Sequence, residues 1–429
     1  MNIYKEMSAL SAGRKTVVTF NPNFRRGSNS LEIDAQKLKE KMDKGEDVFI
    51  LDVRTPEEYE AWRLSYDKHT KTPLIPVDRL FGSQKAIADQ IPKDKEIITL
   101  CAHGNRSMMA AQMLSQMGYN VKSVRGGMAA WNQVYDVAQV ATAPESQVRV
   151  WQLRRISKGC LSYVIAAGKT ATVIDSTCDL DNSVIKLAQE NGLEITNVVD
   201  THMHADHVSG MISLAKRTGA QAHIGSLEGY KVEASGESAK VRPISDGQTI
   251  QVGSGVVLTA IHTPGHTEGS TSYSLEVSST SAATTTAADG LTAKQTYLFT
   301  GDTLFVNAVG RPDLRDKAPE YAELLYGTYQ NKLLNLPDDT LILPAHFDTG
   351  SITLKHGGLV ADTIGSIKKS VKLLSMPKDE FVKFMSSSVP PRPANYKMII
   401  QINQELVACE EINMGDLEAG PNSCAIKMQ

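Results

Sequence analysis

Short apolar runs alternate with amphipathic segments in the first third of the chain, from about Leu31 to Trp131. The runs VFILDV (residues 48–53) and IITLC (residues 97–101) have the length and composition of buried strands. TPEEYEAW follows the first run and predicts a helix in which Thr55 and Glu58 form a capping box. RSMMAAQMLSQMG follows the second run and predicts a helix that ends at Gly118. Strands that alternate with helices in this way predict a parallel sheet covered by helices.

The pattern changes beyond about residue 147, where strand-like runs dominate. Helical segments such as NSVIKLAQENG and GMISLAKRTG separate some of these runs, which predicts two sheets with helices on the outside. The strand-like runs are SYVIAA, TATVID, NVVDT, VVLTAIHT, STSYSLEV, TYLFTG and TLILPAH. The stretch SSTSAATTTAADGLTAKQ (residues 278–295) is too poor in apolar residues to pack, and we expect an exposed hairpin loop there.

These patterns predict an α/β protein with two domains. We place an N-terminal extension at residues 1–30, a parallel α/β domain at 31–134, and a second domain at 148–429. Residues 135–147 (YDVAQVATAPESQ) are small, polar and weakly patterned, and we interpret them as the linker between the domains. A chain of 429 residues is long enough to give each domain its own core.

Composition and charge narrow the classes of function. A hydrophobic content of 41% and a charged content of 22% are typical of a globular protein, and a net charge of -3 argues against a nucleic-acid partner. No stretch has the roughly 18 apolar residues that a membrane span needs, and the N-terminus lacks the apolar core of a secretory signal. We therefore expect a cytoplasmic protein that does not bind membranes. The odd number of cysteines, with no CxxC pair among them, predicts reduced thiols rather than a disulfide framework, and Cys160 and Cys178 read as packing residues.

Cys101 opens the stretch CAHGNRS at the turn between a buried strand and the following helix. Unpaired backbone N–H groups at a helix N-terminus and the positive charge of Arg106 both favour the thiolate form of such a cysteine. The pocket could therefore hold an anionic sulfur species on Cys101. A buried, inert cysteine is the alternative interpretation.

The surroundings of Cys101 favour the catalytic interpretation. CAHGNRS, together with LDVRTPEEYEAW and SVRGGMAAW, resembles the rhodaneses over about a hundred residues. The resemblance implies that Cys101 carries sulfane sulfur as a persulfide. The chain departs from the family in SYDKHTKTPLIPVDRL (residues 65–80), where many rhodaneses have a His-Ile-Pro-Gly-Ala-like segment, and this leaves the contacts to the sulfur donor open.

A second cluster of chemically active residues, THMHADH, follows the strand-like run NVVDT. His202 and His204 point the same way if the strand geometry persists, and Asp206 and His207 follow as the chain turns. His266, Asp302 and His346 also stand where apolar runs end. All of these potential nitrogen and oxygen ligands are therefore expected at the ends of strands. The absence of a thiolate excludes a zinc finger and suits zinc, iron or manganese.

This set resembles the metallo-β-lactamase superfamily from Val148 to the C-terminus, and the implied fold is an αββα sandwich. Two branches of the superfamily fit. Glyoxalase II-like hydrolases use all of these ligands to hold two zinc ions, whereas persulfide dioxygenases use one Fe(II). CLSYVIA, THMHADH, HTPGHTEGS, FTGDTLFVNAVGRPDL and PPRPANYKMIIQIN look more like the persulfide dioxygenases.

That closer resemblance implies that His202, His266 and Asp302 are the iron ligands, with one Fe(II) per chain. The outer shell would then comprise His204, Asp206, His207 and His346, which are also the alternative ligands of a site with two zinc ions. Arg311 and Asp313 form either a loop-fixing ion pair or a support for the site, and Tyr396 could reach a substrate, although PPRPAN is also typical of a segment that turns the chain.

The expected function is a bifunctional enzyme of sulfur metabolism. Cys101 would accept sulfane sulfur from thiosulfate or a similar donor and pass it to a small thiol such as glutathione. Iron and O₂ would then oxidise the resulting thiol persulfide to sulfite. A zinc thioester hydrolase with an appended rhodanese and a non-catalytic sulfur carrier or sensor are the alternatives, and a homo-oligomer is possible.

Overall fold

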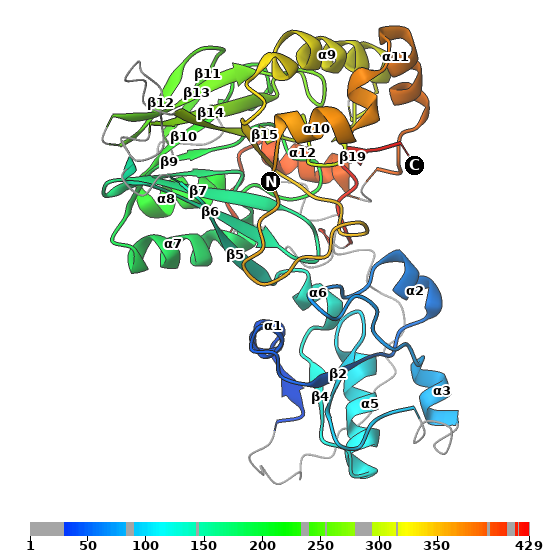
Figure 1. The fold of residues 1–429 in the computed structure, drawn as a ribbon. Coiled ribbons are helices and arrows are strands. Elements are labelled where there is room, and N and C mark those ends of the chain that lie inside the picture. Colours follow the sequence, from blue (N-terminus) through cyan, green and yellow to red (C-terminus); the bar gives the residue numbers. More distant parts are fainter. Residues whose placement is uncertain are drawn as a thin grey trace, which may run out of the picture.

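The computed structural model describes residues 30–82, 90–142, 146–232, 240–253, 255–278, 294–314, 316–392, 395–409, 417–418 and 420–428. The chain folds into two domains, shown in Figure 1 with the first (blue to cyan) beneath the second. The predicted N-terminal extension lies almost wholly outside the described residues.

The first domain is built on a four-stranded sheet in the order β1-β4-β3-β2, and each pair of neighbouring strands is parallel. Thr55 and Glu58 form the predicted capping box at the start of α2. Helix α5 ends at Gln116, two residues before Gly118, where the sequence predicts its end. The elements are β1 (Glu32–Ile33), α1 (Ala35–Asp43), β2 (Val48–Asp52), α2 (Pro56–Ala61), α3 (Val77–Gly82), β3 (Glu96–Leu100), α5 (Asn105–Gln116), β4 (Val121–Val124) and α6 (Gly127–Trp131).

The second domain holds two large sheets, with strand orders β11-β10-β9-β8-β7-β6-β5 and β12-β13-β14-β15-β17-β18. Its strands are β5 (Tyr135–Val140), β6 (Val148–Arg155), β7 (Leu161–Ala167), β8 (Thr170–Ile174), β9 (Glu194–Val199), β10 (Gln221–Gly225), β11 (Lys240–Ile244), β12 (Thr249–Gly253), β13 (Val256–His262), β14 (Thr271–Ser278), β15 (Lys294–Gly301), β16 (Val309–Gly310), β17 (Leu341–Pro344), β18 (Asp362–Thr363) and β19 (Ala425–Ile426). Its helices are η2 (Cys178–Leu180), α7 (Asp181–Glu190), α8 (Met211–Thr218), α9 (Ala318–Asn331), η4 (Leu333–Asn335), α10 (Ile364–Ser370), η5 (Lys372–Ser375), α11 (Lys378–Ser387) and α12 (Tyr396–Gln404).

The two sheets and their helices form four layers, as the sequence predicts. Helices α7 and α8 pack on the outer face of the first sheet, and α9, α10 and α11 pack beside the second (Figure 1). The inner faces meet in a core that includes Ile165 and Tyr273. Because this core continues into the first domain through Trp131 and Leu38, the two domains share one apolar interior.

The predicted linker differs from the structure in its first half. Residues Tyr135–Val140 form β5, the edge strand of the seven-stranded sheet, because alternate residues Asp136, Ala138 and Val140 are buried. The predicted hairpin is present, since Ser278 of β14 pairs with Lys294 of β15. The loop that joins these strands lies outside the described residues, and no described helix is long and apolar enough to cross a membrane.

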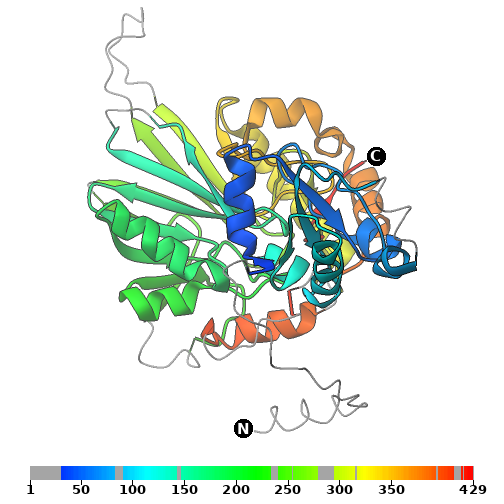
Figure 2. The ribbon, with the colours of Figure 1, turned by 90° about the horizontal axis from the view of Figure 1, so that it is seen from below.

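Residues 65–80, which depart from the rhodanese pattern, lie partly at the interface between the domains. The backbone N–H of Asp67 donates to the carbonyl of Leu354 at 2.8 Å, and the hydroxyls of Ser65 and Thr353 are 3.3 Å apart. At the same interface, the Lys39 ammonium pairs with Asp136 of β5 at 2.7 Å. Figure 2 shows the molecule from below, with the first domain (blue to cyan) in front of the second.

Candidate active sites

Cys101 lies directly after β3, where the chain turns into α5. Its thiol is buried, and Sγ accepts the N–H of Gly104 at 3.1 Å and the hydroxyl of Ser107 at 3.3 Å. Both donors belong to the turn at the N-terminus of α5, so the partial positive charge of that helix end faces the sulfur. The pocket therefore suits a thiolate or an anionic persulfide.

Two glycines permit this turn. Gly104 has a φ of +96°, and a Cβ there would lie 3.1 Å from the backbone nitrogen of Gly126. Gly127 has a φ of +58°, and a Cβ there would lie 2.2 Å from the carbonyl oxygen of Cys101. Side chains at either position would push the turn off β4 and α6.

Arg106, on the first turn of α5, forms a bidentate ion pair with Glu58. Its Nη1 and Nη2 atoms lie 2.7 and 2.5 Å from the two carboxylate oxygens of Glu58. Glu58 also accepts the N–H of Thr55, so the capping box of α2 orients the guanidinium beside the cysteine turn. The positive charge predicted near Cys101 is thus present, but a carboxylate partly neutralises it.

The histidine-rich loop, residues 201–210, follows β9 and is fixed by groups from distant elements. Asp175, after β8, accepts the backbone N–H of Thr201 at 2.7 Å and its hydroxyl at 2.9 Å. On the other side, the Asn403 amide of α12 donates to the carbonyls of His204 and His207 and accepts the N–H of Ser209. Hydrogen bonds to two separate segments, Asp175 after β8 and Asn403 on α12, therefore hold the loop in place.

His202, His266 and Asp302 converge within this framework. Nε2 of each histidine lies 3.6 Å from Oδ2 of Asp302, and all three side chains are buried. Nε2 of His266 and Oδ2 of Asp302 have no hydrogen-bond partner among the described residues. Buried polar atoms without partners are costly, and a metal ion bound at this group would compensate them. The donor set of two imidazoles and one carboxylate therefore fits a divalent transition metal.

Protonation in the group also favours metal binding. Burial lowers the pKa of His266 to about 4, and its Nδ1 lies 2.8 Å from the carbonyl of Arg311, which leaves the lone pair on Nε2. Although burial disfavours charge, His346 and His202 hold the pKa of Asp302 well below its ordinary value, so the carboxylate is ionised. A neutral imidazole and an ionised carboxylate are the ligand forms that a metal requires.

The other predicted ligands surround this group. His346 joins two carboxylates, with Nδ1 at 2.6 Å from Asp302 and Nε2 at 3.0 Å from Asp206. His207 lies beside Asp206, at 3.0 Å from its Oδ1. His204 turns toward Asp175, with 3.3 Å between Nε2 and Oδ1, and is not part of the group around Asp302 Oδ2.

Comparison with known proteins agrees with the two-domain architecture. Residues 34–134 match the rhodanese-like domain family, and residues 157–280 match the metallo-beta-lactamase superfamily. The chain is a rhodanese–metallo-β-lactamase fusion. The predicted families and fold class are therefore confirmed.

Relatives of each half of the fusion carry names from sulfur and thioester chemistry. The mitochondrial persulfide dioxygenase ETHE1 of Bos taurus is 28% identical over 55% of this chain and 78% of its own length. A sulfurtransferase of Allochromatium vinosum is 34% identical over 23% of this chain and 86% of its own length. A hydroxyacylglutathione hydrolase of Polaromonas sp. is 35% identical over 43% of this chain and 61% of its own length.

Arg311 and Asp313 fix a loop of the metallo-β-lactamase domain. Arg311 is fully buried, and its guanidinium contacts Asp313 at 2.7 and 2.9 Å and the carbonyl of Pro390 at 2.7 Å. Arg392 approaches the other side of Asp313 and donates to the Tyr396 hydroxyl at 2.8 Å. The backbone carbonyl of Arg311 thus orients His266, one of the three converging ligands. The guanidinium of Arg311 is occupied by its contacts to Asp313 and Pro390.

Sequence reasoning missed three buried residues of the metallo-β-lactamase domain. Cys160 lies 3.7 Å from Asp206 and 3.8 Å from His207, and Cys424 lies close to Asp302 and His346. Glu418 accepts the N–H of Val208 at 2.7 Å, directly after the histidine cluster. The only signal for Cys160 was its place at the start of a strand, because its partners are far away in sequence.

The expectation that all cysteines are reduced is wrong for one pair. Cys178 of η2 and Cys409, after α12, form a disulfide with Cα atoms 5.5 Å apart. Cys178 is therefore more than a packing residue. The pair joins residues 231 positions apart in the sequence, so its partners could not be matched from local pattern.

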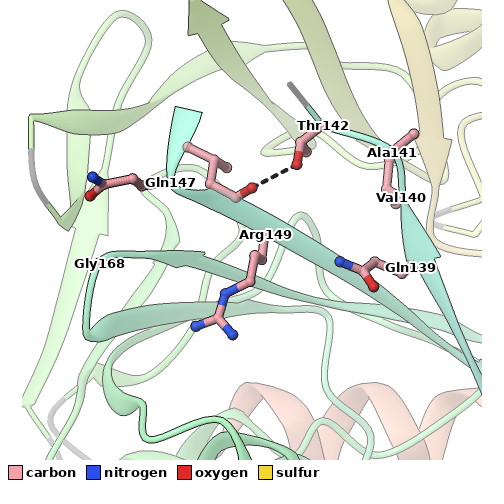
Figure 3. Close-up of a pocket in the computed structure, with 8 residues that line it drawn as sticks. Gln139, Val140, Ala141, Thr142, Gln147, Arg149 and Gly168 are labelled. Carbon is pink, nitrogen blue, oxygen red and sulfur yellow. Dashed lines mark hydrogen bonds between the residues drawn. The ribbon is translucent and has the colours of Figure 1, made fainter. Parts of the chain in front are cut away.

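The surface pocket in Figure 3 lies outside both sites. Its lining residues come from β5, β6, the segment between them and the turn after β7: Gln139, Val140, Ala141, Thr142, Gln147, Val148, Arg149 and Gly168. Arg149 extends over the Trp151 ring and donates to Asn191. None of these residues belongs to a group of potential metal ligands among the described residues.

Proposed function

We propose that this fusion transfers sulfane sulfur through Cys101 and oxidises a low-molecular-weight thiol persulfide to sulfite with O₂ and iron. The net oxidation is RSSH + O₂ + H₂O → RSH + SO₃²⁻ + 2H⁺, so the thiol carrier returns unchanged. Glutathione is the carrier of first choice, and thiosulfate is the first candidate donor to Cys101.

One observation carries the proposal: two histidine nitrogens face the same oxygen of a single carboxylate. His202, His266 and Asp302 offer a two-histidine, one-carboxylate face. The remaining predicted ligands face other groups: His204 faces Asp175, and His346 contacts Asp206 and the second oxygen of Asp302. Such a face leaves coordination positions open and is typical of mononuclear Fe(II) oxygenases. The similarity to the bovine persulfide dioxygenase supports the same reaction class.

Neighbouring residues orient the proposed iron ligands and keep Asp302 ionised. Iron(II) held by His202, His266 and Asp302 would bring a persulfide sulfur and O₂ together and exchange electrons with both. His346 keeps Asp302 ionised and oriented through the 2.6 Å contact at Nδ1. Arg311 holds the His266 ring through its carbonyl, so rotation of that imidazole is restricted.

The rhodanese half would generate the persulfide. The Cys101 thiolate attacks the outer sulfur of thiosulfate, sulfite leaves with the electron pair of the broken S–S bond, and a cysteine persulfide remains. The N–H of Gly104 and the hydroxyl of Ser107 stabilise the negative sulfur. A small thiol then takes the outer sulfur, and the Cys101 thiolate is restored.

The test combines metal content with oxygen consumption. Anaerobically purified protein should contain about one iron per chain and consume O₂ when glutathione persulfide is added. Thiosulfate and glutathione together should also support slow uptake through Cys101. Iron-containing protein that consumes no O₂ with the persulfide would contradict the proposal.

A thioester hydrolase is the second candidate, because the Polaromonas hydroxyacylglutathione hydrolase is 35% identical over the part that it shares with this chain. That function predicts about two zinc ions per chain and release of thiol from an acyl-glutathione without O₂. Assaying the iron-loaded and zinc-loaded protein with both substrates separates the two candidates.

A further inference from the structure

Arg106 brings a positive charge to the Cys101 turn, but Glu58 of α2 holds that charge. Nη1 and Nη2 of Arg106 lie 2.7 and 2.5 Å from the two carboxylate oxygens of Glu58. Hydrogen bonds to Glu58 are the main cause of the raised pKa of Arg106, and the Cys101 sulfur adds a smaller effect of the same sign. The guanidinium therefore acts on the sulfur while a carboxylate compensates its charge.

Two further arginines near the turn are compensated in the same way. Arg54 follows β2, which pairs with β3 on one side, and its Nη2 lies 2.7 Å from the Asp52 carboxylate. Arg125 follows β4, which pairs with β3 on the other side, and its Nη1 lies 2.8 Å from the Asp34 carboxylate. Neither arginine therefore presents an uncompensated positive charge beside the end of β3.

The Glu58–Arg106 pair stands where a dissolved molecule meets it before the thiol. The side chains of Arg106 and Glu58 are 33% and 34% exposed, whereas Cys101 is only 1% exposed. Solvent-exposed charges act over several ångströms at moderate ionic strength. A sulfur donor that approaches from solution therefore experiences both charges of the pair as its outer sulfur comes toward the buried thiol.

The charge at the turn matters because sulfane-sulfur donors differ in charge. Thiosulfate is a dianion, whereas an alkyl thiosulfonate or a deprotonated alkyl persulfide carries one negative charge. Two negative groups, the Cys101 thiolate and the Glu58 carboxylate, face one positive group, Arg106, so the turn is negative overall. A negative turn repels a dianion about twice as strongly as a monoanion at the same distance.

We propose that Glu58 is a specificity-determining residue that makes Cys101 discriminate against dianionic sulfur donors. By compensating Arg106, Glu58 lowers the rate of transfer from thiosulfate relative to singly charged donors such as alkyl persulfides. The inference rests on the proposed sulfur transfer through Cys101 and narrows its donor class. Thiosulfate, the first candidate donor, is the slower of the two kinds of donor.

The experiment measures sulfur transfer to cyanide by the full chain, with thiosulfate or methanethiosulfonate as the donor. In both reactions the Cys101 thiolate attacks the outer sulfur, the S–S bond breaks, and sulfite or methanesulfinate leaves with the electron pair. Cyanide then takes the outer sulfur as thiocyanate, and the thiolate is restored. The two donors thus transfer the same sulfur and differ by one charge.

Glu58→Gln removes the negative charge and leaves the capping box possible, because glutamine also occupies that position in capping boxes. This variant should raise kcat/KM about tenfold with thiosulfate and about threefold with methanethiosulfonate, since the repulsion scales with donor charge. The ratio between the donors should therefore rise about threefold. A purely structural effect would change both values by the same factor.

Two matched variants isolate the charge of Glu58. Glu57→Gln removes the same charge from an exposed position one residue away and should leave the donor ratio unchanged. Glu58→Gln combined with Arg106→Gln makes both side chains neutral, so the pair has no net charge, as in the wild type. The donor ratio of this double variant should return to the wild-type value.

A salt titration of the wild type applies even where a variant fails to fold. Added salt should raise the rate with thiosulfate more than the rate with methanethiosulfonate, because it screens the repulsion. A thiosulfate rate that falls with salt would overturn the proposal. Equal changes with both donors in Glu58→Gln, or the same gain in Glu57→Gln, would also overturn it.

Failure of the proposed sulfur transfer itself is distinguishable. Absence of thiocyanate from both donors would remove that activity and the role of Glu58 with it. Iron content and O₂ uptake with glutathione persulfide would then still test the oxygenase half separately.

Discussion

Nδ1 of His346 lies 2.6 Å from Oδ1 of Asp302, and this contact joins the two groups of potential ligands. Asp302 turns its other oxygen toward His202 and His266, while His346 turns Nε2 toward Asp206. A substitution at His346 should therefore change the iron affinity of His202, His266 and Asp302, although His346 is not one of these three proposed ligands.

His346→Ala should weaken iron binding by about 10- to 100-fold, because Asp302 loses the group that orients it and keeps it ionised. The dissociation constant can be measured by anaerobic titration with Fe(II). His223→Ala is the matched control, since His223 pairs with Asn197 and not with the ligand groups. Equal affinity in the His346→Ala and control proteins would show that Asp302 needs no such support.

The two proposed activities should separate by single substitutions. Asp302→Ala should abolish persulfide-dependent O₂ uptake and leave the sulfurtransferase activity, because Cys101 lies in the other domain. Cys101→Ser should do the reverse. Oxygen uptake that survives Asp302→Ala would show that the assigned ligands are wrong, and loss of both activities in a folded, iron-containing variant would show that the sites depend on each other.

Arg311→Lys should destabilise the protein by about 2 kcal/mol and lower its iron affinity, because lysine cannot replace the guanidinium contacts to Asp313, Pro390 and Ser423. Urea unfolding and iron titration measure the two effects. Arg392→Lys is the matched control, as Arg392 contacts the same Asp313 from a more exposed position. A control effect as large as that of Arg311→Lys would argue against a special role for the buried guanidinium.

Breaking the Cys178–Cys409 disulfide should cost about 2–4 kcal/mol, because the bond closes a very long loop in the unfolded chain. The free energy of unfolding of Cys409→Ser should match that of the wild type in reductant, and added reductant should not change the variant further. A wild type that unfolds identically with and without reductant would show that the bond contributes nothing.

The Glu58–Arg106 pair predicts a specific acid dependence. The hydrogen bonds from Arg106 lower the pKa of Glu58 from 4.5 to about 2, so the pair stabilises the fold above pH 4.5 and the contribution is lost as the pH falls toward 2. Because the pair is about one-third exposed, solvent limits the effect to about 1 kcal/mol. The stability difference between wild type and Glu58→Gln should shrink over this range, and a difference that is constant with pH would contradict the assignment.

Local features were predictable from the sequence because residues close together in the chain determine them. The capping box of Thr55 and Glu58 needs only four consecutive residues, and the alternation of strands and helices around Cys101 needs only hydrophobic periodicity. The same logic failed for residues 135–140, whose weak pattern hid the edge strand β5. The buried face of β5 carries the charged Asp136, which pairs with Lys39, whereas the apolar Val137 is exposed, so the usual alternation of apolar and polar residues is hidden.

The sequence by itself determined the two families, the cysteine turn and the set of histidines and aspartates at strand ends. Only the tertiary structure decided that His202, His266 and Asp302 face one point and that Cys160 joins Asp206, His207 and His346. It also paired Cys178 with Cys409. The physical reason is that strand register and helix docking set the distances between remote residues, and both depend on packing across the whole core rather than on neighbouring residues.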